Sequence, residues 1–381
     1  MEYRQFPGLA WRPSALGFGA MRLPVIDGDQ SKVDIPEATR IIRYAIDHGV
    51  NYLDTAYFYH GGQAEQAIAQ ALKNGYREKI KLATKFPARD VKSAADFDRA
   101  FAEQLDRLQT DKIDFYLLHG LSKPGWTRLY ELGILPWLEL QVAKGRLEYL
   151  GFSFHDDYEV FKQIVDAYDN WTFCQIHFNF MDQDYQAGRR GIEYAAGKNL
   201  GIIVMEPLRG GQLARPPEIV NTIWKNAAVQ RSPVEWALRW IWNYPQISLI
   251  LSGMSSMEQV VENVAIASRA GNSRLNPEEL ALFDKARQAY QGLCPIPCTG
   301  CRYCMPCPNG VEIPTIFRIY NEMAMYKDVR VSKWRYNGGP WGLNSKQNAS
   351  NCLECGKCAE ACPQHIPIPE WLKKVHAELK T

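Results

Sequence analysis

The chain has 381 residues, of which 46% are hydrophobic and 23% are charged, as is ordinary for a globular protein. A formal net charge of +2 and the even spread of Lys and Arg give no reason to expect a nucleic-acid partner. The sequence has neither a run of about 18 apolar residues nor a signal-peptide pattern, so we expect no membrane association and a cytoplasmic location.

Short β-branched or apolar runs alternate with longer segments of helical period from residue 15 to residue 268. This alternation is typical of a parallel βα protein. The apolar runs predict strands at 15–19, 51–55, 80–85, 113–119, 147–152, 172–177, 201–205 and 247–251. The segments of helical period predict helices at 35–48, 63–73, 94–108, 137–144, 158–167, 189–198, 233–242 and 257–268.

Eight strands, each followed by a helix, are the elements of a closed (β/α)₈ TIM barrel, so the predicted fold class is α/β. A doubly wound open sheet is the alternative. We expect residues 1–13 to form a hairpin that plugs the barrel floor, and a helix at 277–290 to close the domain. Residues 208–232 are too many for an ordinary βα loop, and a long loop at a barrel mouth usually covers a ligand.

The composition changes to Cys, Pro, Gly and Asn at Gly292. We therefore predict a barrel domain over 1–291 and a small, mainly α-helical domain over 292–381, with helices at 315–326 and 370–379. Nine of the ten cysteines lie between Cys294 and Cys362, and the tenth is Cys174. In a reducing compartment such crowding indicates metal or redox chemistry before disulfides.

Four polar side chains stand at the ends of three successive predicted strands. The stretch NYLDTAYFYHGG releases Asp54 and Tyr59 into a loop, and the next two strands end at Lys85 and His119. Parallel strands end at one mouth, where barrels keep their chemistry. A buried ammonium lowers the pKa of a neighbouring phenol, and a carboxylate fixes that ammonium, so we predict Tyr59 as general acid with Lys85 and Asp54 as its tuning pair.

His119 would then orient a carbonyl oxygen. Each of these residues also has a purely structural interpretation, as a helix cap or loop residue, a surface lysine or a core histidine. Four such residues at successive strand ends are unlikely to occur together by chance, which favours the catalytic interpretation.

The chain here resembles the aldo-keto reductase family. LDTAxxY holds Asp54 and Tyr59, ATKF holds Lys85 and YLLH holds His119, in the order and spacing of that family's catalytic tetrad. The resemblance spans residues 1–290 and extends through GFSFH, MEPLRGG and SGMSSMEQVVENVA. It implies a barrel in which NAD(P)H lies across the C-terminal face and gives hydride to a small aldehyde or ketone, while the tyrosine supplies the proton.

The same resemblance implies a set of cofactor-binding residues, namely Ser153, Gln175, Met205, Pro207, Leu208, Ser252, Gly253, Gln259, Glu262 and Asn263. Phe154 replaces the usual Asn of the family's Ser-Asn pair, and Met205 stands where many members stack an aromatic ring on the nicotinamide. Gly253 and Gln259 occupy positions where NADPH-specific members often carry a Lys and an Arg for the 2′-phosphate. The choice between NADH and NADPH therefore stays open.

The second cysteine run, Cys352-x₂-Cys355-x₂-Cys358-x₃-Cys362-Pro, reproduces the ligand run of bacterial ferredoxins for a [4Fe–4S] cluster. The first run has one residue fewer between its last two cysteines. Two clusters would use Cys298, Cys301, Cys304 and Cys362 for one, and Cys352, Cys355, Cys358 and Cys307 for the other. A single cluster is the alternative. A zinc ribbon is disfavoured, because CxxC pairs suffice for zinc and a third and fourth Cys at these intervals with a trailing Pro are not needed.

We therefore predict an oxidoreductase that reduces a carbonyl compound and uses [4Fe–4S] clusters for electron transfer. A nicotinamide delivers two electrons together and each cluster takes one, so direct exchange needs a carrier such as a flavin. One alternative is a flavin-mediated electron-transfer reductase with a redox partner protein, and another is a barrel that works alone beside structural or regulatory clusters. A non-catalytic redox sensor that only binds a nucleotide is disfavoured by the complete tetrad.

Overall fold

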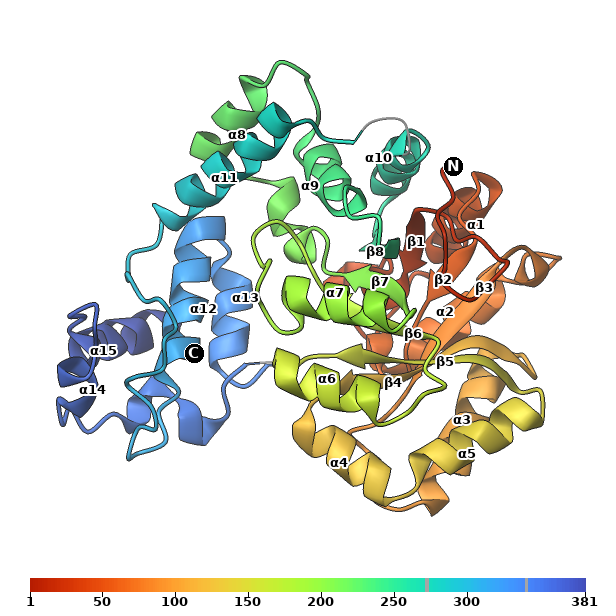
Figure 1. The fold of residues 1–381 in the computed structure, drawn as a ribbon, viewed down its shortest axis with the longest axis horizontal. Coiled ribbons are helices and arrows are strands. Elements are labelled where there is room, and N and C mark those ends of the chain that lie inside the picture. Colours follow the sequence, from red (N-terminus) through yellow and green to blue (C-terminus); the bar gives the residue numbers. More distant parts are fainter. Residues whose placement is uncertain (271–273, 340–341) are drawn as a thin grey trace. The chain divides into compact units, whose positions relative to one another are not determined.

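The computed structural model describes residues 1–270, 274–339 and 342–381. Eight parallel strands pair in chain order and close into a barrel (Figure 1), which confirms the predicted (β/α)₈ fold over the open sheet. Their bounds are β1 (Leu16–Gly19), β2 (Tyr52–Asp54), β3 (Lys81–Phe86), β4 (Ile113–Leu121), β5 (Leu147–Phe154), β6 (Phe173–His177), β7 (Gly201–Met205) and β8 (Ile247–Gly253). Strands such as GIIVM are apolar throughout because helices cover the outside of a parallel sheet.

The helices around the barrel agree with the predicted segments to within a few residues. They are α1 (Ile35–Asp47), α2 (Gln63–Ala71), α3 (Ala95–Leu108), α5 (Ile134–Ala143), α6 (Tyr158–Asp166), α7 (Gly188–Gly197), α9 (Pro233–Trp242) and α10 (Met257–Ala267). A further helix, α4 (Lys123–Glu131), was not predicted. In α1 the Asp34 side chain accepts a hydrogen bond from the Glu37 amide and so fixes the helix start, while Ile41, Ile42 and Ala45 are buried.

The N-terminal segment plugs the barrel at the N-terminal ends of the strands, as predicted. The amide of Arg4 donates to the carbonyl of Pro13 at 2.8 Å, so the segment doubles back on itself. Phe6 is buried, with its ring 5.6 Å from that of Phe115. A Cβ at Gly201, where β7 begins, would stand 2.1 Å from the Phe6 ring, so the plug requires glycine there.

The chain divides into two compact units, which we describe separately: Met1–Ala214 with Arg231–Pro277, and Arg215–Gln230 with Glu278–Thr381. The boundary between residues 291 and 292 stays a prediction. The expected mouth loop over 208–232 was wrong in part, because it contains the helix α8 (Glu218–Lys225). Val220 and Trp224 lie one turn apart and are buried, and Trp224 packs on Phe283 of α11 (Pro277–Gln291) at 5.2 Å.

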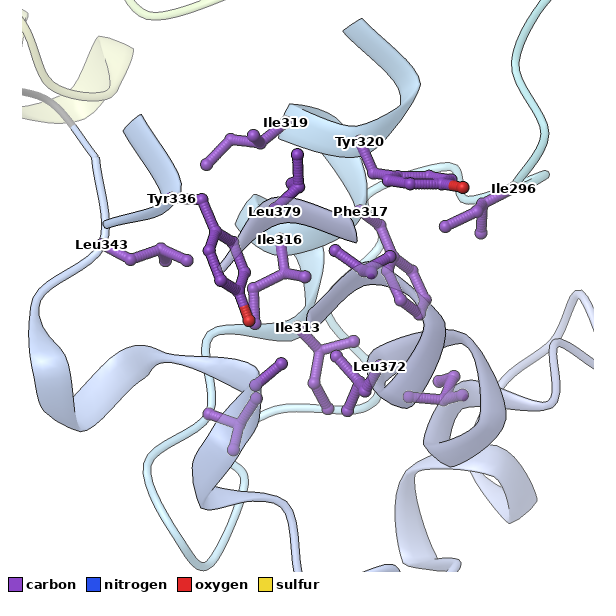
Figure 2. Packing of buried hydrophobic residues seen from close by; sticks show 14 of the residues in the cluster. Ile296, Ile313, Ile316, Phe317, Ile319, Tyr320, Tyr336, Leu343, Leu372 and Leu379 are labelled. Carbon is purple, nitrogen blue, oxygen red and sulfur yellow. The ribbon is translucent and has the colours of Figure 1, made fainter. Parts of the chain in front are cut away.

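The second unit is helical, as predicted, and its described part contains no strand. Its further helices are α12 (Ile313–Tyr326), α13 (Val329–Tyr336), α14 (Lys357–Glu360) and α15 (Ile368–Leu379), of which α13 was not predicted as a separate helix. Figure 2 shows its core, in which α12 contributes Ile316 and Phe317, α13 contributes Tyr336 and α15 contributes Leu372. None of the helices in the described ranges has the length and apolar character needed to cross a membrane.

Candidate active site and cysteine cluster

The four residues of the predicted tetrad come together at the C-terminal end of the barrel. Asp54 is the last residue of β2, Lys85 the last but one of β3, and His119 lies near the end of β4. Tyr59 begins the 3-10 turn η3 (Tyr59–Gly62) that follows β2. Parallel pairing of β2 with β3 and of β3 with β4 carries these side chains to one mouth.

The ammonium of Lys85 is the centre of the site. Its Nζ donates to Oδ1 of Asp54 at 2.5 Å, to the carbonyl oxygen of Thr55 at 2.8 Å and to the hydroxyl of Tyr59 at 3.3 Å. These acceptors use the three hydrogens of the ammonium. Lys85 is 1% exposed and Asp54 3%, so this is a buried charge that is both paired and hydrogen-bonded.

The electrostatics keep Lys85 charged and Tyr59 protonated. Burial lowers the pKa of Lys85, but the charges of Asp54 and Tyr59 and their hydrogen bonds outweigh burial and raise this pKa above its usual value. Burial raises the pKa of Tyr59, and the Lys85 ammonium opposes that rise without cancelling it. Lys85 therefore acts on the phenol in the predicted direction, but burial has the larger effect.

His119 faces the Tyr59 hydroxyphenyl group, with ring centroids 5.8 Å apart and an edge-on geometry. The imidazole also stacks on the Phe58 ring, with centroids 6.2 Å apart. Burial, followed by the charge of Lys85, holds the pKa of His119 well below its usual value. A neutral imidazole keeps one N–H donor, so His119 is suited to donate a hydrogen bond to an oxygen beside Tyr59.

Several partners of the tetrad were not predicted. Nε2 of Gln175, expected only as a cofactor-binding residue, donates to Oδ2 of Asp54 at 3.0 Å. Behind β3, Nε2 of Gln104 donates to the Lys85 carbonyl oxygen at 3.1 Å and to Oε1 of Glu65 at 2.9 Å. Glu65 and Gln104 are buried polar residues on the apolar faces of α2 and α3. A polar residue within an apolar face was the only feature of the sequence that could have indicated these contacts.

The predicted cofactor-binding residues lie on β5 to β8 and on the segments that follow β7 and β8. Ser153 lies on β5, Gln175 on β6 and Met205 at the end of β7, where Pro207 and Leu208 follow. Ser252 and Gly253 end β8, while Gln259, Glu262 and Asn263 lie on α10. All ten therefore stand around the same face of the barrel as the tetrad.

Some of these side chains already have partners in the protein. The Ser153 hydroxyl accepts a hydrogen bond from the Gly120 amide at 2.7 Å. Asn263 donates to the Ser252 hydroxyl at 3.1 Å, and Gln259 accepts from the Ser255 amide at 2.9 Å. Phe154, which replaces the family's Asn, packs on Phe161 of α6 and so belongs to the layer between sheet and helices.

A second polar cluster supports the loop after β7. Oδ2 of Asp182 accepts from Nε of Arg209 at 2.8 Å and from Nδ2 of Asn179 at 3.0 Å, and lies 2.8 Å from Nε2 of His177. Asn179 also donates to the carbonyl of Glu206, whose φ of 59° is in the left-handed region. This cluster therefore fixes the strained turn that precedes Pro207 and Leu208.

In the second unit, all ligands predicted for one iron–sulfur cluster line one pocket. Its lining includes Cys298, Cys301, Cys304 and Cys362, together with apolar side chains such as Phe317 and Ile366. Cys307, Cys352 and Cys358 pack against the same core, and Cys355 is exposed. In the described ranges no three His, Cys, Asp or Glu side chains converge as ligands of one metal ion. Thiolates around a cubane stand apart, because the four irons lie between them.

Comparison with known proteins gives the family. Residues 15–288 match the model of the aldo/keto reductase family, and residues 297–366 match that of a 4Fe-4S dicluster domain. L-galactose dehydrogenase of Arabidopsis thaliana is 26% identical over 321 residues, which cover 77% of this chain and 96% of that protein. Methylglyoxal reductase YeaE of Escherichia coli (strain K12) is 26% identical over 280 residues, which cover 70% and 88%.

Solved structures agree. Aldo-keto reductase AKR11C1 from Bacillus halodurans, in its holo form, is 27% identical with a TM-score of 0.62 and covers 75% of this chain and 96% of its own. An aldo/keto reductase from Klebsiella pneumoniae in complex with NADP and acetate is 25% identical with a TM-score of 0.58, covering 75% and 95%. The chain belongs to the aldo/keto reductase family, and it carries a 4Fe-4S dicluster domain in its C-terminal part.

Proposed function

We propose that the barrel reduces a small aldehyde or ketone with hydride from a nicotinamide dinucleotide. The observation that carries this proposal is the bonding of Lys85, whose buried ammonium joins the Asp54 carboxylate to the Tyr59 hydroxyl. A structural ion pair would not need a phenol as third partner at the mouth of a barrel. The Klebsiella pneumoniae relative in complex with NADP supports the choice of cofactor.

The residues at the mouth fit the nicotinamide group. The Ser153 hydroxyl accepts one hydrogen bond from the Gly120 amide and still has its own hydrogen to donate. Gln175 uses one amide hydrogen on Asp54, which leaves its second amide hydrogen and its carbonyl oxygen for a carboxamide. When bound, the dinucleotide supplies the hydride.

The chain's own residues supply the proton and the charge stabilisation. Tyr59 donates its hydroxyl proton to the carbonyl oxygen as general acid, and the Lys85 ammonium stabilises the negative charge that develops on Tyr59. Asp54 holds Lys85 in position. Neutral His119 donates a hydrogen bond to the same carbonyl oxygen and so orients the substrate.

For the second unit we propose two [4Fe–4S] clusters that exchange electrons with a redox partner protein. The first would be held by Cys298, Cys301, Cys304 and Cys362, and the second by Cys307, Cys352, Cys355 and Cys358. The pocket shared by the first four cysteines supports this pairing, because it joins the first run to the last cysteine of the second.

The test is Tyr59→Phe in the full chain, with methylglyoxal as the first substrate and NADPH and NADH as alternative donors. Removal of a general acid costs on the order of 10²–10⁴ in kcat, while the cluster absorbance should not change. Tyr57→Phe is the matched control, because the Tyr57 hydroxyl bonds Glu103 on α3 outside the tetrad. Full turnover by Tyr59→Phe would overturn the assignment of the general acid.

A further inference from the structure

Arg22 occupies a distinctive place at the barrel mouth. It ends the 3-10 turn η1 (Ala20–Arg22), which directly follows β1, and its side chain is exposed. The last residue of β1, Gly19, pairs with Gly253 at the end of β8. Arg22 therefore leaves the sheet at the C-terminal face, beside a position expected to bind the dinucleotide.

The side chain of Arg22 fills the space that a side chain at residue 253 would need. A Cβ built at Gly253 would stand 3.3 Å from Cβ, Cγ and Cδ of Arg22. Further out, Nη2 of Arg22 lies 2.9 Å from the position that a Cβ at Gly210 would take. The guanidinium thus reaches from the end of β8 to the loop after β7, and glycine on both sides leaves it room.

The turn that carries Arg22 is anchored to the catalytic loop. The amide of Leu23 donates to Nε2 of His60 at 3.1 Å, and Nδ1 of His60 lies 2.8 Å from the carbonyl of Gln30. This pattern requires a neutral imidazole, and burial lowers the pKa of His60 accordingly. His60 directly follows Tyr59, so one loop positions both the phenol and the guanidinium.

Arg22 makes neither an ion pair nor a hydrogen bond with the residues that the structure describes. The carboxylate of Glu206 lies on the same side, with Oε2 3.7 Å from the same Cβ position at Gly210. Arg209, on the same loop, is instead engaged with Asp182. The guanidinium of Arg22 is thus available to a ligand between Leu208 and Gly253.

We propose that Arg22 binds a phosphate group of the nicotinamide dinucleotide and supplies the cation that residue 253 lacks. A guanidinium presents two parallel N–H donors to a phosphate, a stronger contact than a neutral hydrogen bond. The inference rests on the proposed function, since it needs a dinucleotide across this face. The phosphate is either the pyrophosphate, which NADH and NADPH share, or the 2′-phosphate of NADPH alone.

The test is a binding titration of the full chain with NADPH and with NADH, in which tryptophan fluorescence and calorimetry measure the dissociation constants. Arg22→Gln should weaken binding roughly tenfold to a hundredfold, as expected for a charge-assisted hydrogen bond. Arg22→Lys keeps the charge without the planar fork and should weaken binding less. Arg190→Gln is the control for loss of one charge, because Arg190 lies exposed on α7 with Glu159 as its partner.

Each outcome decides one point. An equal loss for NADH and NADPH supports contact with the pyrophosphate, and a loss for NADPH alone supports contact with the 2′-phosphate. Unchanged dissociation constants for both dinucleotides in Arg22→Gln overturn this inference but leave the proposed function standing. If the unaltered protein binds neither dinucleotide, the proposed function fails and this inference fails with it.

Discussion

Gln175 of β6 and Asp54 of β2 are joined by a hydrogen bond of 3.0 Å across the interior of the barrel. In a closed barrel of eight strands in sequential order, β2 and β6 lie opposite each other. Asp54 is therefore held from both sides, with Oδ1 on Lys85 and Oδ2 on Gln175. The position of the ammonium beside Tyr59 thus depends on closure of the barrel as well as on the neighbouring strand.

Gln175→Leu should remove this support while preserving the volume of the side chain. A buried carboxylate oxygen would lose its donor, so we expect the free energy of unfolding to fall by about 1–3 kcal/mol. We also expect a lower kcat, because Asp54 would hold Lys85 less rigidly. Urea unfolding and steady-state kinetics measure the two effects. Wild-type values of both quantities would show that the hydrogen bond has no role in positioning Asp54.

Most of the barrel could be predicted because each element leaves a local pattern. The buried strands are continuous apolar runs, and helices such as α1 carry a capping aspartate, Asp34, before a helical apolar period. The helix α8 was missed although its apolar residues Ile219, Val220, Ile223 and Trp224 have helical spacing, because the Gly and Pro residues that precede it indicated a loop.

The tetrad could be predicted in the same way, because its members lie at or just after the ends of three successive strands and parallel strands share one mouth. The contacts between distant segments could not be predicted. Gln175 is 121 residues from Asp54, and no local pattern indicates which of its groups meets the carboxylate. Likewise, the fit of Arg22 against Gly253 depends on β1 pairing with β8, which is the step that closes the barrel.

Acid should destabilise the barrel through His155, which follows β5. Burial lowers the pKa of His155 from its usual 6.5 to about 4, with the charge of His177 adding to the effect. Between these pH values the unfolded chain binds a proton that the folded chain does not, so stability falls as the pH drops from 6.5 toward 4. The loss is on the order of 2 kcal/mol, once the partial exposure of the ring is allowed for.

Urea unfolding across this pH range measures the slope. The glutamine side chain of His155→Gln cannot take up a proton in this pH range, so the stability of this variant should depend less steeply on pH between 6.5 and 4. The same slope in variant and wild-type protein would assign the acid sensitivity to other groups.

Electron exchange between the nicotinamide dinucleotide and the iron–sulfur clusters can be tested with anaerobically purified protein. A hydride carries two electrons and each cluster accepts one, so NADPH alone should leave the cluster absorbance unbleached. Dithionite, which supplies single electrons, should bleach it and is the positive control. Bleaching by NADPH would instead indicate a carrier such as a flavin, which release of the cofactors and mass spectrometry would identify.

The pairing of the two cysteine runs makes a sharp prediction for Cys362. If the ligands pair across the runs, Cys362→Ser removes one ligand from the cluster held by Cys298, Cys301 and Cys304, although Cys362 stands in the other run. The protein should then lose up to about half of its iron and sulfide, and Cys298→Ser should give the same spectrum. Cys294→Ser is the control, because Cys294 lies outside both runs and does not line the pocket.

The rival arrangement makes each run one cluster's complete ligand set. In that case Cys362→Ser and Cys298→Ser would damage different clusters, and their electron paramagnetic resonance spectra after reduction would be complementary. The double variant discriminates most directly. With pairing across the runs it loses no more iron than either single variant, because both substitutions fall on one cluster. With separate runs the two losses add, so a double variant that loses nearly all of its iron would contradict the pairing that the shared pocket supports.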